Sequence, residues 1–175
     1  FDGLKTSFAA DGRAFYLRDV ELLHRNGIAR GKVLGHDGQL RYQVSADVPV
    51  DPWRPFFAGK PFGKVLDKIE ARQGHQVAVA LEGSSDLSPS LSDPYAKRNW
   101  SCAGTVHATG FRYSGVPLHE FAAQLSLNQL EYRFDRPRAV FDDRSYPLRR
   151  GPPGRLAAQA DNVTIDRTAE LVRAN

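Results

Sequence analysis

The sequence predicts a mainly β protein, an antiparallel meander with one short amphipathic helix. Three observations support this fold class. Apolar and polar residues alternate through most of the chain, turn-forming pairs such as Asn26-Gly27 and Asp37-Gly38 separate the alternating segments, and a single segment has helical spacing. The chain of 175 residues, 41% apolar and 25% charged, has the composition of a globular domain and can bury an ordinary core.

The first part of the chain predicts consecutive strands joined by tight turns. The second strand changes phase between Leu17 and Val20, as a β-bulge would cause. The fourth strand alternates from Leu40 to Val48 without interruption. We expect these strands over residues 4–8, 15–22, 28–34 and 40–48.

A helix is predicted over residues 60–73, after three prolines within residues 49–55 that exclude a central strand. Between Pro61 and Gly74, apolar residues recur at helical spacing; they are Phe62, Val65, Leu66 and Ile69. Because the opposite side of this helix is basic and aromatic residues precede it, residues 53–72 are a candidate contact with a membrane surface. The simpler interpretation is that the helix covers one end of the sheet and its basic residues face water.

The chain is expected to have two related halves. Residues 1–83 predict a β-meander with the helix and one further strand, and residues 100–175 predict a second β-meander of the same elongated sheet. Residues 84–99 are rich in Ser, Asp and Pro and predict a loop or linker between them.

The second half contains a well-defined predicted hairpin whose turn is Asn128-Gln129. Pairing outward from that turn sets Leu127 opposite Leu130, Leu125 opposite Tyr132 and Ala123 opposite Phe134. The other face of the hairpin is polar and carries Gln124, Ser126, Glu131, Arg133 and Asp135. One face of the sheet is therefore expected to be apolar, and its function depends on what covers it.

Residues that carry catalytic or metal chemistry do not gather in the sequence. The five histidines are scattered without the spacing of a local metal site. Asp142-Asp143 is explained as turn chemistry, because adjacent strand residues point to opposite faces. The single cysteine, Cys102, excludes an internal disulfide and a thiolate metal cage, and we interpret it as a small strand residue. The sequence therefore predicts no enzyme, no metal site and no cofactor.

Arginines interleave with aromatic residues towards the end of the chain, as they do on sheets that bind nucleic acid. However, Tyr132 and Phe134 share the apolar face with leucines, whereas Arg133 points the other way. The net charge of +4 is also mild. We therefore expect a solvated basic face and no nucleic-acid partner. The arginines in question are Arg133, Arg136, Arg138, Arg144, Arg149, Arg150 and Arg155.

Three stretches share a common cadence, in which a short strand, a glycine-marked turn and another strand follow one another. They are GLKTSFAADGRAFYLRDVELLHRNGIARGKV with LRYQVSADV, GTVHATGFRYSGVPLHEFAAQLSLNQLEYRFD, and LAAQADNVTIDRTAELVRA. In this cadence the chain resembles AsmA-like proteins, the bacterial envelope family that includes TamB. The likeness covers most of the chain outside residues 84–99.

The resemblance implies a long periplasmic run of β-strands curled into a half-pipe with an apolar interior, anchored by an inner-membrane helix near its start. It implies a role in moving phospholipid between the inner and outer membranes and in envelope integrity, with other envelope proteins among the partners. It supplies no catalytic residues. Because the chain has no Met, begins at Phe1 and contains no apolar run long enough to span a bilayer, we expect an internal fragment whose anchor lies outside it.

A groove of this kind needs alternating strands with an apolar face that no second layer covers fully. Acyl chains gain about 0.8 kcal/mol per buried CH₂, so such a groove can hold a lipid tail without specific contacts. The alternative is a β-sandwich or adhesin-like module, whose two sheets cover each other and whose partners are proteins or glycans. Our candidates for lining the groove are Leu40, Tyr42, Val44, Leu125, Leu127, Leu130, Tyr132 and Phe134.

Overall fold

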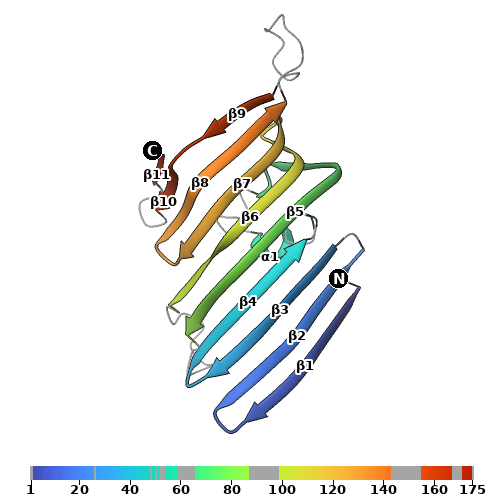
Figure 1. The fold of residues 1–175 in the computed structure, drawn as a ribbon, viewed down its shortest axis with the longest axis vertical. Helices are drawn as coiled ribbons and strands as arrows, with labels where there is room; N and C mark the ends of the chain where they lie inside the picture. The colour runs from blue at the N-terminus through green and yellow to red at the C-terminus, as the bar shows by residue number, and fades with distance from the viewer. Residues whose placement is uncertain are drawn as a thin grey trace, which may run out of the picture.

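The computed structural model describes residues 2–25, 27–47, 49, 51, 54–58, 66–86, 99–142, 155–166 and 171–174. These residues form eleven strands of one antiparallel sheet and one four-residue helix. The predicted fold class, a mainly β protein built by antiparallel pairing, is confirmed. Figure 1 shows the strands from β1 to β8 side by side in the order of the sequence.

Consecutive strands from β1 to β8 pair antiparallel, including β4 and β5, which the helix α1 separates in the sequence. The bounds are β1 Gly3–Asp11, β2 Ala14–His24, β3 Gly27–His36, β4 Gln39–Asp47, α1 Arg54–Phe57, β5 Ile69–Asp86, β6 Trp100–Tyr113, β7 Val116–Asn128, β8 Glu131–Asp142, β9 Arg155–Gln159, β10 Asn162–Asp166 and β11 Leu171–Ala174. The sheet is open, with β1 at one end and β11 at the other.

Strand β8 has two partners on its edge away from β7. Residues 131–135 pair with β10, and residues 138–142 pair with β9. Between the two pairings the chain bends: Arg136 has a φ of 47°, and its backbone N–H donates to the carbonyl of Asp161 at 2.8 Å. Strands β9 and β10 therefore continue one another along the same edge.

Local backbone conformation explains two of the hairpins and the bulge in β2. Asp37 and Gly38 have φ values of 46° and 76°, which is the backbone of a type I′ turn. Ser114 and Gly115, at 50° and 80°, form the same kind of turn between β6 and β7. The predicted bulge in β2 is confirmed, because its register against β3 shifts between Leu17 and Val20. Asp19 lies within this bulge and has a φ of 50°.

The helix predicted over residues 60–73 is not confirmed. From Ile69 onward the chain is strand β5, and Ile69 and Ala71 pair with Tyr113 and Phe111 of β6. Residues 60–65 lie outside the described residues. The four apolar residues that suggested a helix were too few to exclude a strand, and an irregularity between Ala71 and Gln76 interrupts the alternation that would have revealed one.

The first three residues of the linker predicted over residues 84–99 belong to a strand. Residues 84–86 belong to β5, and residues 87–98 lie outside the described residues. The backbone N–H of Asp86 donates to the carbonyl of Asn99 at 2.9 Å, so the two ends of this segment are joined. Strands β5 and β6 pair from Gln76 to Ser85, which places the strands before and after it in one sheet.

The register predicted for the β7–β8 hairpin is wrong by two residues. Leu127 pairs with Tyr132 and Leu125 with Phe134, so Leu130 lies in the turn. The physical reason is the side chain of Asn128, whose Oδ1 accepts the backbone N–H groups of Leu130 at 2.8 Å and of Glu131 at 2.9 Å. This Asx-type closure makes the loop longer than the two-residue hairpin that alternation suggested.

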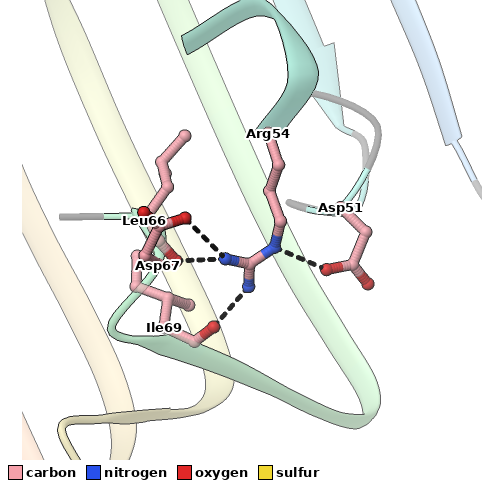
Figure 2. Close-up of polar contacts among 5 residues, drawn as sticks. All are labelled: Asp51, Arg54, Leu66, Asp67 and Ile69. Carbon is pink, nitrogen blue, oxygen red and sulfur yellow. Dashed lines mark hydrogen bonds and ion pairs between the residues drawn. The ribbon is translucent and has the colours of Figure 1, made fainter. Parts of the chain in front are cut away.

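A side chain of α1 holds the connection between β4 and β5 in place (Figure 2). The Arg54 guanidinium donates through Nη1 to the carbonyl of Leu66 and through Nη2 to the carbonyl of Ile69. Its Nε lies 3.0 Å from Oδ1 of Asp51, and Nη1 lies 4.0 Å from Oδ1 of Asp67. One side chain therefore joins the start of α1 to the chain that leads into β5.

The buried core of the described residues is small. It contains two clusters of buried apolar residues. One consists of Ala29 and Ala46, and the other of Ala108, Phe111 and Leu118. Partly buried residues such as Leu22, Val79 and Phe121 pack against them. Among the described residues no large side chain is fully buried. A sheet whose stability comes from such small clusters leaves most of its apolar surface incompletely covered.

Candidate functional site

The strand register sorts the side chains of the sheet onto two faces of opposite character. Paired residues stand side by side on the same face, so a row can be followed across the strands. Two neighbouring rows contain only apolar residues, glycine and Cys102. These rows are Phe134, Leu125, Gly104, Leu81, Val44, Gly31 and Val20, and Tyr132, Leu127, Cys102, Gly83, Tyr42, Val33, Leu17 and Phe8. We call the face that they occupy the apolar face.

The opposite face, which we call the polar face, is defined by the rows that alternate with these. They are Arg133, Ser126, Ala103, Glu82, Gln43 and Lys32, and Asp135, Gln124, Thr105, Ala80, Ser45, Arg30, Glu21 and Lys5. The separation holds across eight neighbouring strands, from β1 to β8. A sheet sorted in this way presents one surface to water and one to an apolar environment.

Seven of the eight predicted groove residues lie on the apolar face and are partly buried. Leu40 belongs to it because it pairs with Gly35 and Ser85, in a row that ends at Trp100. The other six are in the two rows given above. Leu130 differs, because the register places it in the β7–β8 turn, where it is 61% exposed. The sequence missed Trp100, whose alternation with Cys102 was the available signal.

Aromatic side chains on the apolar face lie across glycines of neighbouring strands. A Cβ added to Gly83 would lie 2.6 Å from Oη and 2.7 Å from Cζ of Tyr42, and a Cβ added to Gly35 would overlap the ring of Phe15. The rings of Trp100 and Tyr132 have centroids 6.4 Å apart with their planes at 51°. The rings of Tyr42 and Phe15 therefore cover the backbone at neighbouring glycines, and the aromatic residues add apolar surface to this face.

Two polar groups on the apolar face, the Tyr42 hydroxyl and the Cys102 thiol, are kept in their neutral form. The hydroxyl of Tyr42 donates to the carbonyl of Ser101 at 3.3 Å, and burial raises the pKa of Tyr42 to about 12. Burial likewise raises the pKa of the Cys102 thiol. Neither group is poised as a nucleophile at neutral pH, and the centre of this face carries no charge.

The polar face carries a shallow open depression of about 740 Å³ over β2 to β6. Charges of both signs line it, including Arg18, Arg30, Lys32 and Glu82. Arg30 lies 3.1 Å from Glu21 in an exposed ion pair. Such a mixed and solvated surface is what water-facing strands require, and it does not select one class of charged ligand.

The arginines that suggested a basic face are only partly described. Arg133 lies 2.7 Å from Asp135, and Arg138 lies 3.4 Å from Glu120, which also lies 3.3 Å from His107. The side chains of Arg144, Arg149, Arg150 and Arg155 lie outside the described residues. Where it is described, the basic character of the polar face is therefore offset by neighbouring carboxylates.

The described part of the chain has neither a cluster of metal ligands nor a membrane-spanning helix. It holds no group of three His, Cys, Asp or Glu side chains placed to bind a metal ion. None of its helices has the length and hydropathy needed to cross a membrane. The candidate membrane-surface segment, residues 53–72, is described only at 54–58 and 66–72, where Lys68 is exposed and Arg72 lies in β5.

Comparison with known proteins gives no match. No protein-family model matches the chain, and neither a curated protein nor a solved structure does. The resemblance to AsmA-like proteins therefore stays a prediction from three stretches of sequence. Any function assigned to the chain depends on the two faces of its sheet.

Proposed function

We propose that this chain is a non-enzymatic segment of an AsmA-like periplasmic protein, and that its apolar face is a groove for phospholipid acyl chains moving between the inner and outer membranes. The observation that carries this proposal is the apolar face itself. Two adjacent rows of apolar residues cross seven and eight strands of a single sheet, and none of the large side chains in them is fully buried. The sequence resemblance supports the envelope location and the lipid cargo.

The energetics of such a groove do not require a specific binding motif. Each CH₂ group that an acyl chain buries contributes about 0.8 kcal/mol, and the apolar side chains beneath it become covered at the same time. A tail lying along the rows through Leu125 and Tyr42 would meet apolar groups, the Cys102 thiol and tyrosine hydroxyls, and no charged side chain of these rows. The lipid headgroup would remain at the rim, in water or against charged residues.

The half-pipe curvature belongs to this proposal, and glycines on the apolar face support it. Gly31, Gly83 and Gly104 lie in the apolar rows, where each lacks the side chain that would hold neighbouring backbones apart. A Cβ at Gly31 would lie 2.7 Å from the carbonyl oxygen of Gln43, and one at Gly104 would overlap the carbonyl of Ala80. Glycines at such positions allow a sheet to bend towards the face that lacks the side chains.

Site-specific photo-crosslinking tests the proposal. A photoreactive phenylalanine analogue is placed at Tyr42 or Leu125 on the apolar face, and at the adjacent Gln43 or Gln124 on the polar face as matched controls. The chain is expressed in a bacterial periplasm, irradiated and analysed by mass spectrometry. We expect phospholipid adducts at 42 and 125 and none at 43 and 124, because adjacent strand residues point to opposite faces.

Two results would contradict the proposal. Equal lipid labelling at all four positions would mean adventitious contact with membrane. Protein or glycan adducts at 42 and 125, without lipid, would favour the adhesin-like alternative, in which another macromolecule covers the apolar face. The same samples, extracted before irradiation, should also release co-purified phospholipid.

A further inference from the structure

Polar side-chain atoms on the apolar face gather towards one end of its strands. The Trp100 row adjoins the row of Tyr42 and consists of Phe15, Gly35, Leu40, Ser85 and Trp100. The row of Leu125 lies on the other side of the Tyr42 row and is followed by the Val106 row, which consists of Leu22, Ala29, Ala46, Val79, Val106 and Ala123. Across β2 to β7, the rows of Leu125 and Val106 carry no side-chain nitrogen, oxygen or sulfur atom. The polar atoms of these four rows therefore lie in the Trp100 and Tyr42 rows.

Amphipathic aromatic side chains supply most of these polar atoms. Trp100 has an indole N–H, and Tyr42 and Tyr132 have hydroxyl groups, each on an apolar ring. The rings of Trp100 and Tyr132 have centroids 6.4 Å apart, and all three residues are partly buried. Such side chains are enriched where an apolar region meets a polar one, as at the headgroup level of a membrane. This composition is typical of the water-facing margin of an apolar surface.

The two ends of the face also differ in what lies beyond these rows. Past the Trp100 row the β3–β4 hairpin turns at Asp37-Gly38, and the Asp37 side chain is 62% exposed. Past the Val106 row the strands β6 and β7 continue into the buried cluster of Ala108, Phe111 and Leu118. The apolar face therefore runs from a margin near water to a region that is apolar and buried.

We propose that a phospholipid lies on this face with its ester groups over the Trp100 row and its tail ends over the Val106 row. This orientation rests on the proposed function, and it adds which end of the face takes which part of the lipid. Ester carbonyls accept hydrogen bonds and the indole of Trp100 is a donor, whereas the Val106 row offers only apolar contact. The headgroup then lies past Trp100, where the strands turn and water is close.

Quenching of tryptophan fluorescence by brominated lipids tests the orientation. Trp53→Phe leaves Trp100 as the one tryptophan of the chain. The purified chain is mixed in turn with two phosphatidylcholines, one brominated next to the ester and one brominated next to the terminal methyl group. We expect about twofold stronger quenching by the ester-proximal bromines, because about 13 Å separates the Trp100 and Leu125 rows along a strand.

A tryptophan on the Leu125 row is the matched reporter. Leu81→Trp is combined with Trp53→Phe and Trp100→Phe. Position 81 pairs with Gly104, which has no side chain to crowd the new ring, and here the terminal bromines should quench more strongly. Gln43→Trp in the same background lies on the polar face and should be quenched by neither lipid. Circular dichroism checks that the variants keep their β content.

The possible failures are distinguishable. Equal quenching of Trp100 by the two lipids, or stronger quenching by the terminal bromines, would overturn the orientation and leave the proposed function standing. Quenching at position 43 as strong as at position 100 would mean adventitious contact with lipid and would likewise overturn the orientation. Absence of quenching at positions 81 and 100, together with absence of lipid adducts at 42 and 125, would contradict the proposed function and the orientation with it.

Discussion

At the scale of single residues, glycines of the apolar face set how closely the strands and rings lie together. The strongest case is Gly104 in β6, where an added Cβ would overlap the carbonyl of Ala80 and lie 2.9 Å from Cα of Leu81. Both are backbone atoms of β5 and cannot rotate away. Gly104 is therefore required by its neighbours in the sheet, although its alternation with Cys102 and Val106 alone would allow any apolar residue.

We expect Gly104→Ala to lower the free energy of unfolding by about 1–3 kcal/mol, because two paired strands must move apart. Gly12→Ala is the matched control, since a Cβ at Gly12 meets nothing within 4 Å, and its effect should stay within about 0.5 kcal/mol. Urea unfolding followed by circular dichroism measures both. Equal stabilities of the two variants would contradict this account of β5–β6 packing.

Tyr42 should make stability depend on pH in the alkaline range. Burial raises its pKa from 10.0 to about 12, so the folded state favours the neutral phenol. The resulting stabilisation is fully present below pH 10 and is lost as the pH rises through about 12. Tyr42→Phe should therefore differ from the original chain by a constant amount below pH 10 and by less above it. Parallel pH profiles up to pH 12 would rule this out.

At the scale of elements, α1 and the start of β5 depend on one guanidinium group. Arg54 is the donor to two backbone carbonyls, of Leu66 and Ile69, and also approaches Asp51. No local pattern in residues 49–73 indicates this arrangement, because both carbonyls belong to residues more than ten positions later. The spacing of apolar residues predicts a helix over residues 60–73, whereas the pairing of Ile69 with Tyr113 makes the chain from Ile69 onward a strand.

We expect Arg54→Lys to destabilise the chain by about 1–3 kcal/mol, since a lysine keeps the charge but cannot reach the acceptors in the same fork geometry. Arg30→Lys is the control: its side chain is 60% exposed and its pair with Glu21 should contribute at most about 1 kcal/mol. Thermal unfolding of the two variants compares them. A larger loss for Arg30→Lys would show that the Arg54 contacts do not hold this connection.

The β7–β8 hairpin shows which part of an element local sequence can predict. Alternation assigned Leu125, Leu127, Tyr132 and Phe134 to one face correctly, because a shift of two residues preserves the face. It failed on the cross-strand partners, which depend on how Asn128 closes the turn. Leu130 was the one groove candidate misplaced by this error, because it was counted as strand and lies in the turn.

At the scale of the whole molecule, the described strands of one sheet separate their side chains into an apolar face and a polar face. We propose acyl chains as the partner of the apolar face, whereas the polar face meets water. Crosslinking at positions 42 and 125, with positions 43 and 124 as controls, reports on this division directly.

The sequence by itself determined the β class, the turn at Asp37-Gly38 and the division into two faces, because each depends on neighbouring residues: φ preferences at that turn and period-two alternation along each strand. Only the tertiary structure decided that Ile69 begins a strand, that Leu127 pairs with Tyr132 and that Leu130 lies in a turn. These outcomes depend on contacts between distant segments and on turn geometry, which no local period records.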